Sequence, residues 1–196
     1  MAVAPASPEP VRVVVVVGSA RDGRLAPDIA RWLADRTDRR DDLVTDVVDL
    51  ADTPLPASLA PDAPQTVALR PRLAAAEAFV IVVPEYNRGV PGPLKTLIDS
   101  FNAEWEAKPV AFVGYGLGMA GGVRAVEHLR QVFAEFHCVG VKDTVSFPRV
   151  LEHYDAEGRF PADPEAAGAA AKVMLDQLVW WGRVLRDAKR LHPYRS

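Results

Sequence analysis

The chain has 196 residues, 49% of them hydrophobic and 25% charged, so it is long enough to bury one sizeable core and short enough to form one domain. Its formal net charge of −3 comes from interspersed acids and bases, which argues against a nucleic-acid-binding or anionic-membrane-binding surface. The single cysteine, Cys138, excludes an internal disulfide framework and a cysteine metal cluster, and the four histidines show no metal-ligand spacing, so we expect no metal site.

The N-terminal segment resembles neither a secretory signal nor a membrane anchor. Residues 1–10 contain three prolines and lack the basic region and long apolar segment of a signal peptide. No stretch of the sequence approaches the ~20 apolar residues that span a bilayer. We therefore expect a flexible lead-in over residues 1–10, one domain over residues 11–191, a tail over residues 192–196, and a cytoplasmic protein.

Apolar, β-branched runs alternate along the chain with segments whose apolar residues recur at helical spacing. The pattern predicts strands over residues 11–17, 43–49, 78–83, 109–115 and 138–147. It predicts helices ending near residue 37 and over residues 65–76, 92–101, 123–135 and 164–191, with Pro71 bending or shortening the second. Residues 50–64 and 148–161 are expected to be irregular. Five strands that alternate with helices predict a doubly wound, three-layer α/β/α sandwich around a parallel sheet.

The first strand turns into its helix through residues 18–24, which contain Ser19, Arg21 and Arg24. Backbone N–H groups at such a turn carry partial positive charge, a serine hydroxyl can donate, and guanidinium groups bind oxygens in pairs. The loop therefore suits a phosphate monoester, and the alternative is a solvated turn that carries arginines. It is not a Walker loop, because the required spacing and lysine are absent.

The third strand ends in a loop edged by proline and glycine, residues 84–92. Its Glu85, Tyr86 and Asn87 offer backbone amides, carbonyls and one aromatic face. An open α/β sheet holds its ligand at the carboxyl ends of its strands, where preset backbone groups can bind a polar heterocycle. Taken alone, the loop is equally well interpreted as a polar turn whose asparagine and prolines only punctuate the structure.

The fourth strand ends in a run of five glycines within residues 114–122. Gly116, Gly118 and Gly121 have the G-x-G-x-x-G spacing of a dinucleotide fingerprint, and Asp143 lies further on. In the dinucleotide fold this loop follows the first strand of six, whereas here only one strand remains after it. We favour a loop whose backbone closely approaches a flat ring, and a nucleotide- or sugar-phosphate-binding domain without flavin is an alternative.

Together the three loops resemble those of the NADPH-dependent FMN reductase family of flavodoxin-like proteins, which includes quinone, chromate and azo-dye reductases. The likeness spans about residues 11–147, and its most specific element is the P-E-Y-N motif at residues 84–87, followed by V-P-G-P-L-K at residues 90–95. Arg24 departs from the pattern, because this position is often a hydroxyl residue in the family.

The resemblance implies a flavodoxin-like fold with a five-stranded parallel sheet in the order 2-1-3-4-5, and a bound FMN. The FMN phosphate would lie on the first loop, and the ring along residues 84–87 and against residues 116–122. The implied cofactor-binding residues are Ser19, Arg21, Arg24, Pro84, Glu85, Tyr86, Asn87, Tyr115, Gly116, Gly121 and Gly122. A homodimer or homotetramer is also implied, with the helix at residues 94–100 and the Trp180 region as expected interfaces that complete the flavin pocket.

The implied activity is an NAD(P)H oxidoreductase in which FMN carries the chemistry. Hydride from NADPH or NADH reaches flavin N5, the nicotinamide leaves, and an acceptor takes its place in a ping-pong cycle. The acceptor is a quinone-like, azo, nitro or metal-oxyanion compound, or another flavin. No catalytic side chain is required for the first step, and backbone donors near the ring would stabilise the reduced flavin. Tyr86, Asn87 and Arg88 are the expected walls of the acceptor site.

A flavodoxin that transfers electrons without being an enzyme is the alternative on the same fold. Such proteins are typically strongly acidic and use a hydroxyl-rich phosphate loop, whereas this chain is near neutral and carries arginines. The sequence therefore favours the enzyme.

Overall fold

The computed structural model describes residues 9–194, in which strands and helices alternate. The strands are β1 (Val11–Val17), β2 (Leu43–Asp49), β3 (Ala78–Pro84), β4 (Pro109–Tyr115), β5 (Val139–Gly140) and β6 (Val145–Phe147). The helices are α1 (Ala26–Thr37), α2 (Pro64–Ala75), α3 (Gly92–Asp99), α4 (Val123–Glu135), the 3₁₀ helix η1 (Val150–His153) and α5 (Pro164–Leu191). Most of the expected lead-in, residues 1–8, and the end of the expected tail, residues 195–196, lie outside the described residues.

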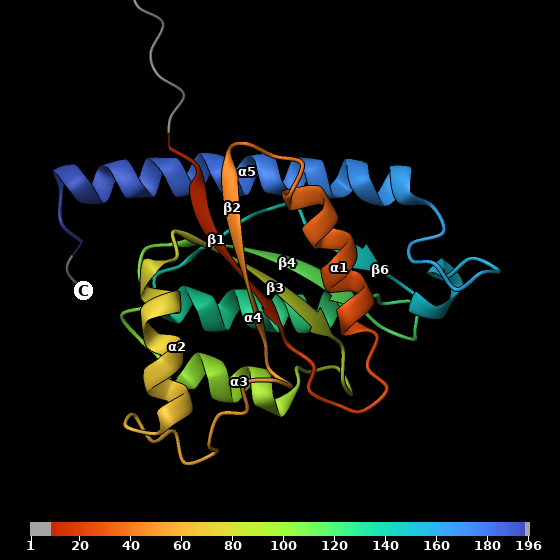
Figure 1. Ribbon diagram of the computed structural model, residues 1–196, viewed down its shortest axis with the longest axis horizontal. Helices are drawn as coiled ribbons and strands as arrows, with labels where there is room; N and C mark the ends of the chain where they lie inside the picture. Colours follow the sequence, from red (N-terminus) through yellow and green to blue (C-terminus); the bar gives the residue numbers. More distant parts are fainter. Residues whose placement is uncertain (1–8, 195–196) are drawn as a thin grey trace, which may run out of the picture.

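The strand pairs of the sheet are parallel, in the order β2-β1-β3-β4-β5, and β6 also pairs with β4 (Figure 1). The expected flavodoxin-like order 2-1-3-4-5 is confirmed. The expected strand at residues 138–147 is divided, because β5 and β6 pair with different parts of β4. Between them Asp143 leaves the ladder, since its backbone N–H and its carboxylate both bind the side chain of Gln177 on α5.

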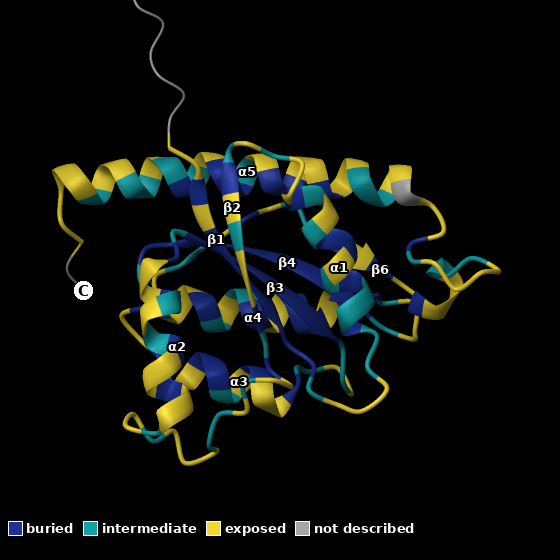
Figure 2. Cartoon of the chain, in the orientation of Figure 1, coloured by how far each residue is buried: buried dark blue, intermediate teal, exposed yellow. Residues whose placement is uncertain are grey.

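The inner strands β1, β3 and β4 are buried on both faces apart from Arg12, as their apolar sequence predicts, whereas the edge strand β2 is partly exposed at Val44 and Val47. Alternate valines of β1 belong to two separate cores: Val13, Val15 and Val17 pack with α1 and α5, whereas Val14 and Val16 pack with α2, α3 and α4. Figure 2 shows β3 and β4 as a buried layer between helices whose outer faces are exposed, and β2 at the edge with exposed residues. The expected three-layer sandwich is confirmed.

Pro71 does not shorten α2. Proline removes one backbone donor from a helix and disfavours helical geometry at the residue before it. The helix nevertheless continues to Ala75, and Leu69 and Leu73, on either side of Pro71, are buried in the core. Packing of this apolar face therefore outweighs the local penalty.

The last helix, α5, runs along one face of the sheet (Figure 1). Gly182 lies close to the start of β1, because a Cβ there would be 2.7 Å from Cγ1 of the fully buried Val11. Within residues 9–194 no helix, α5 included, is both long enough and apolar enough to cross a membrane.

Gly182→Ala should therefore lower the free energy of unfolding by about 1–3 kcal/mol, because the added methyl group must displace β1 or α5. Gly168 on the same helix is the matched control, because its nearest neighbour is the flexible Arg36 side chain, 3.4 Å from an added Cβ. Gly168→Ala should raise the stability by about 0.5–1 kcal/mol through helix propensity. Urea unfolding measures both, and equal effects of the two substitutions would contradict the close approach of Gly182 to Val11.

Candidate functional site

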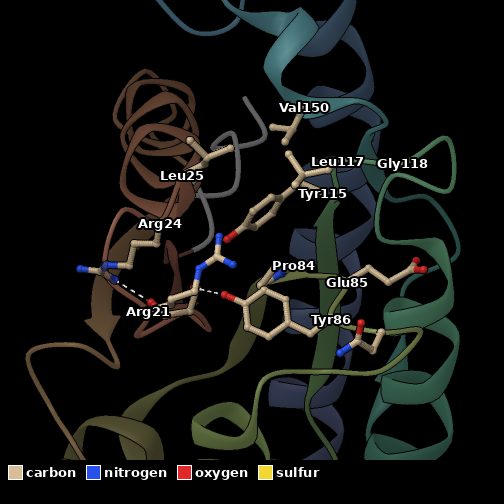
Figure 3. Close-up of a pocket in the computed structure, with 13 residues that line it drawn as sticks. Arg21, Arg24, Leu25, Pro84, Glu85, Tyr86, Tyr115, Leu117, Gly118 and Val150 are labelled. Atoms are coloured by element: carbon tan, nitrogen blue, oxygen red, sulfur yellow. Dashed lines mark hydrogen bonds between the residues drawn. The ribbon is translucent and has the colours of Figure 1, made fainter.

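The three loops singled out in the sequence meet at the carboxyl ends of β1, β3 and β4. They line a cleft of about 450 Å³, a volume typical of small-molecule and cofactor sites. Its lining is Ser19, Arg21, Arg24, Leu25, Pro84, Glu85, Tyr86, Asn87, Tyr115, Gly116, Leu117, Gly118 and Val150 (Figure 3). The structure thus brings nine of the eleven expected cofactor-binding residues together.

Hydrogen bonds between neighbouring strand ends guide the loops into the cleft. The Gly18 N–H donates to the Val82 carbonyl and the Glu85 N–H to the Tyr115 carbonyl, each at 2.9 Å. A Cβ at Gly18 would lie 3.0 Å from the same Val82 oxygen and 3.1 Å from Leu94 on α3. Glycine is therefore needed where the first loop leaves the sheet.

Arg24 lines the cleft, but its guanidinium also bonds other groups of the protein. Its Nη1 donates to the Ser19 carbonyl at 2.8 Å and also bonds the Asp49 carboxylate at the end of β2. The hydrogen bond to Asp49 raises the pKa of the Arg24 guanidinium. The Asp49 carboxylate also accepts the Ala51 N–H at 3.0 Å. Arg24 thus fastens the first loop to the neighbouring strand.

Arg21 is the other arginine of the loop, and within residues 9–194 it forms no ion pair. Its guanidinium lies over the ring of Tyr86, with 5.4 Å between the guanidinium carbon and the ring centroid. The Tyr86 hydroxyl shares a 2.8 Å hydrogen bond with the hydroxyl of Ser19, a residue that is fully buried. Figure 3 shows Arg21 and Tyr86 converging from the first and second loops.

The second loop contains a tight turn with unusual backbone geometry. Tyr86 and Gly89 exchange backbone hydrogen bonds of 2.9 and 3.1 Å, and the intervening Asn87 and Arg88 have φ values of 49° and 68°. Positive φ at both central positions defines a type I′ turn, which Asn tolerates and Arg adopts at a cost of about 1–2 kcal/mol. Strain of this kind is concentrated at functional sites. Arg88 is exposed and, unlike Asn87, does not line the cleft.

Glu85 ties the second loop to the N-terminus of α4. Its carboxylate accepts hydrogen bonds from Arg124 Nη1 at 2.6 Å and from the Arg124 backbone N–H at 3.2 Å. The Glu85 side chain is only 11% exposed. A carboxylate at a helix N-terminus is also stabilised by the helix dipole. The loop is therefore anchored at its start by an ion pair and a helix terminus.

Tyr115 forms the floor of the cleft at the end of β4. It is 5% exposed, and this burial is the main reason why the pKa of its hydroxyl is raised. The hydroxyl therefore stays neutral and can both donate and accept a hydrogen bond. In Figure 3 it points toward the guanidinium of Arg21.

Gly121 and Gly122 do not line the cleft. Their φ values are 56° and 87°, and a Cβ at Gly122 would overlap the backbone of Gly114 and Tyr115. A Cβ at Gly121 would lie 2.7 Å from the Pro148 nitrogen. The close approach that these glycines allow is to the protein's own backbone, whereas the sequence interpretation assigned it to a ligand ring.

Four lining residues were not among the cofactor-binding residues named from the sequence: Leu25, Leu117, Gly118 and Val150. Leu117, 68% exposed, and Gly118 belong to the loop at residues 116–122 that was expected against the ring, and Leu25 adjoins Arg24. Val150 belongs to η1, in a stretch interpreted only as irregular. Its N–H donates to the Gly116 carbonyl at 2.9 Å, a contact across 34 positions that no local pattern indicates.

The overall structure is similar to that of the flavoenzyme NAD(P)H:acceptor oxidoreductase FerB from Paracoccus denitrificans. The TM-score is 0.70 and the sequence identity 26%, and the match covers 89% of this chain and 98% of that one. The model of the NADPH-dependent FMN reductase family matches residues 11–152, which include all three loops of the cleft. The chain belongs to the NADPH-dependent FMN reductase family.

Two curated family members show how far the likeness extends. An NAD(P)H-dependent FMN reductase from Schizosaccharomyces pombe is 37% identical over 121 residues, which are 57% of this chain and 60% of that protein. A 2-hydroxy-1,4-benzoquinone reductase from a Burkholderia species is 34% identical over 131 residues, 63% of this chain and 70% of that protein. The chain thus matches less than two thirds of the length of the yeast relative.

The anchoring of the second loop predicts a measurable coupling between Glu85 and Arg124. In a double-mutant cycle with Glu85→Gln and Arg124→Gln, the coupling free energy should be about 1 kcal/mol, because the carboxylate is largely buried. The pair Lys172–Asp176 on α5 is the matched control, since its side chains are 72% and 44% exposed. Its coupling should be no more than about 0.5 kcal/mol. A coupling at Glu85 that does not exceed the control would contradict the anchoring role.

Proposed function

We propose that the chain binds FMN in this cleft and is an NAD(P)H-dependent oxidoreductase. The observation that carries the proposal is Arg21, a cation without an acidic partner within residues 9–194, beside the buried Ser19 hydroxyl in the turn that leads into α1. A helix start, a hydroxyl and an unpaired guanidinium together suit a phosphate monoester. The membership of the chain in a family of FMN reductases supports the same cofactor.

The remainder of the cleft suits the flat ring of the cofactor. Residues 84–87 supply backbone groups in a fixed turn, and residues 115–118 face them from the end of β4. The ring would therefore be held by backbone groups and by Tyr115. In this proposal Arg24 does not contact the phosphate. Its guanidinium instead holds the loop through Asp49 and the Ser19 carbonyl.

When bound, FMN would accept hydride from NADPH or NADH and pass two electrons to a second substrate. The protein's part is to bind, to orient and to exclude water. Arg21 and Ser19 fix the phosphate end, and the Glu85–Arg124 pair keeps the 84–87 backbone in place. Leu25 and Val150 border the cleft with apolar surface. The neutral Tyr115 hydroxyl holds its proton and can donate it in a hydrogen bond.

The second substrate in this proposal is a quinone-like, azo, nitro or metal-oxyanion compound, or a flavin. Relatives named as quinone reductases and a benzoquinone reductase favour a quinone as the first acceptor to assay. Purified protein should be yellow, and it should oxidise NADPH or NADH faster when a soluble quinone is added. Bound FMN without nicotinamide oxidation would instead indicate an electron-transfer flavodoxin. A colourless protein that also fails to quench FMN fluorescence would contradict the flavin site.

The phosphate assignment predicts that Arg21→Ala weakens FMN binding by about 10–100-fold, the loss expected for one charge-assisted hydrogen bond or pair. Riboflavin has the same ring but no phosphate, so its affinity should change little. Fluorescence quenching measures both dissociation constants. An equal loss of affinity for the two ligands would show that Arg21 acts on the ring or on the fold.

Asp49→Ala separates the two possible roles of Arg24, because Asp49 lines no part of the cleft. If Arg24 positions the loop through Asp49, this substitution also weakens FMN binding. If Arg24 binds the phosphate itself, removal of Asp49 frees its guanidinium, and FMN affinity stays the same or increases. We expect the first result.

We also infer a homodimer or homotetramer, with α5 as one interface. Trp180 is 57% exposed, and Val173, Val184 and Leu191 are exposed on the same helix, spaced from it by seven, four and eleven positions. The other expected interface, α3, is less suitable, because its apolar residues Leu94, Leu97 and Ile98 are fully buried in the core.

Trp180→Glu should therefore reduce the molar mass measured by light scattering, because a carboxylate cannot be buried without a partner. The control is Lys172→Glu on the same helix, whose side chain is 72% exposed beside Asp176. An unchanged mass in the Trp180 variant would exclude this face as an interface.

A further inference from the structure

A second hollow, of about 280 Å³, lies at the amino ends of the strands, on the opposite edge of the sheet from the cleft. We call it the pole pocket. Its charged lining consists of five cations and one carboxylate: Arg12, Lys108, Arg186, Lys189, Arg190 and Glu77. The seven-residue strands separate it from the cleft by about 20 Å. Five cations thus line this hollow although the chain has a net charge of −3.

The three arginines of the pole pocket have acidic partners. Arg12 and Arg186 share Glu77, at 3.1 and 3.4 Å, and Arg190 lies 3.6 Å from the Glu9 carboxylate. The two lysines differ: within residues 9–194, neither Lys108 nor Lys189 has a carboxylate within 4 Å. Lys108 Nζ donates to two carbonyls at the end of α2, at 2.9 and 3.1 Å, and lies 5.4 Å from the centroid of the Phe79 ring, so it has at most one further N–H for a ligand.

Burial makes these unpaired charges costly. Lys108 is 6% exposed, and desolvation lowers its pKa to about 8, with the nearby Lys189 adding to the effect. Burial also lowers the pKa of Lys189. The groups that favour the charged form of Lys108 are Cys138, Glu104 and Glu77, and they do not compensate for its burial. Buried Arg186 Nε has no hydrogen-bond partner in the described structure, and the Asp187 carboxylate lies 3.8 Å from it.

The nearby helix ends do not balance this charge. α2 ends beside Lys108, and Lys189 and Arg190 stand in the last turn of α5. Each helix C-terminus is equivalent to roughly half a negative charge, so the two together supply about one. Two ammonium groups carry more than that. The pole pocket therefore has room and residual positive charge for an anion.

We propose that the pole pocket binds a small oxyanion of the phosphate class, held between the ammonium groups of Lys108 and Lys189. Lysine binds phosphate as a point charge, and the neighbouring guanidinium groups of Arg12 and Arg186 can contribute further donors. The volume admits inorganic phosphate or a small phosphate monoester. The proposal is independent of the flavin site, because the two hollows share no residue.

The test follows thermal unfolding while potassium phosphate replaces potassium chloride at constant ionic strength. The parent protein carries Arg21→Ala, which weakens phosphate binding at the cleft, and the comparison with the Lys189 variant isolates the contribution of the pole pocket. In this parent, 10 mM phosphate should raise Tm by about 2–4 °C at pH 7. Adding Lys189→Gln should weaken the apparent affinity about 10-fold. The matched control, Lys172→Gln, lies on the same helix outside the pole pocket and should keep the parental response.

The proposal would be overturned if phosphate raised Tm no more than chloride does. An equal shift of Tm in the parent and in the Lys189 variant would also overturn it. Repeating the titration with glycerol 3-phosphate distinguishes inorganic phosphate from a phosphate monoester as the ligand. Tighter binding of the ester would indicate a phosphorylated metabolite, and equal or weaker binding would indicate inorganic phosphate. The phosphate titration of Tm does not require bound FMN. It therefore tests the pole pocket even if the flavin proposal fails.

Discussion

The candidate site depends on the parallel register of three buried strands. Val17 lies opposite Val82, and Pro84 opposite Tyr115, so β1, β3 and β4 end close together at one edge of the sheet. Backbone hydrogen bonds continue this ladder into the loops, from Gly18 to Val82 and from Glu85 to Tyr115. Each loop therefore starts from a fixed point on a rigid core, and the cleft is formed where parallel α/β sheets place their ligands. A shift of one residue in β3 would turn its side chains to the opposite faces and separate the loops.

Within this frame, contacts inside the protein set the shape of the cleft. Arg24 holds the first loop to Asp49, and Glu85 holds the second loop to α4. Such contacts order the loops before any ligand binds, which reduces the entropy that binding must offset. The hydrogen bond between Ser19 and Tyr86 is of a different kind, because both hydroxyls line the cleft. When a ligand binds, each hydroxyl can give up its hydrogen bond to the other and bond a ligand oxygen instead. The Arg24 and Glu85 contacts do not need to break.

The sequence predicted the elements and most of the cleft, because both depend on local patterns. Uninterrupted valines identified β1, and the P-E-Y-N motif identified the second loop, whereas the order of the strands came from the resemblance to a family. Contacts between distant residues were not predictable. Arg24 was interpreted as a phosphate ligand from its place in the first loop, and no local pattern indicates its contact with Asp49, 25 positions away. The close approach of Gly122 to Tyr115 likewise requires the folded loop. The division of β5 from β6 depends on Gln177 in the last helix.

The carboxyl and amino edges of the sheet differ in how the charge of the helix ends acts on an anion. In a parallel α/β fold, helices begin at the carboxyl edge of the sheet and end at the amino edge, so their dipoles favour anions at the first and oppose them at the second. At the carboxyl edge α1 starts directly after the first loop, so in the proposed phosphate site a single arginine, Arg21, would add its charge to that of the helix start. At the amino edge, the ends of α2 and α5 repel an anion. An anion in the proposed pole-pocket site would therefore need full side-chain charges in excess of the helix ends, and the buried Lys108 and the half-buried Lys189 carry such charges.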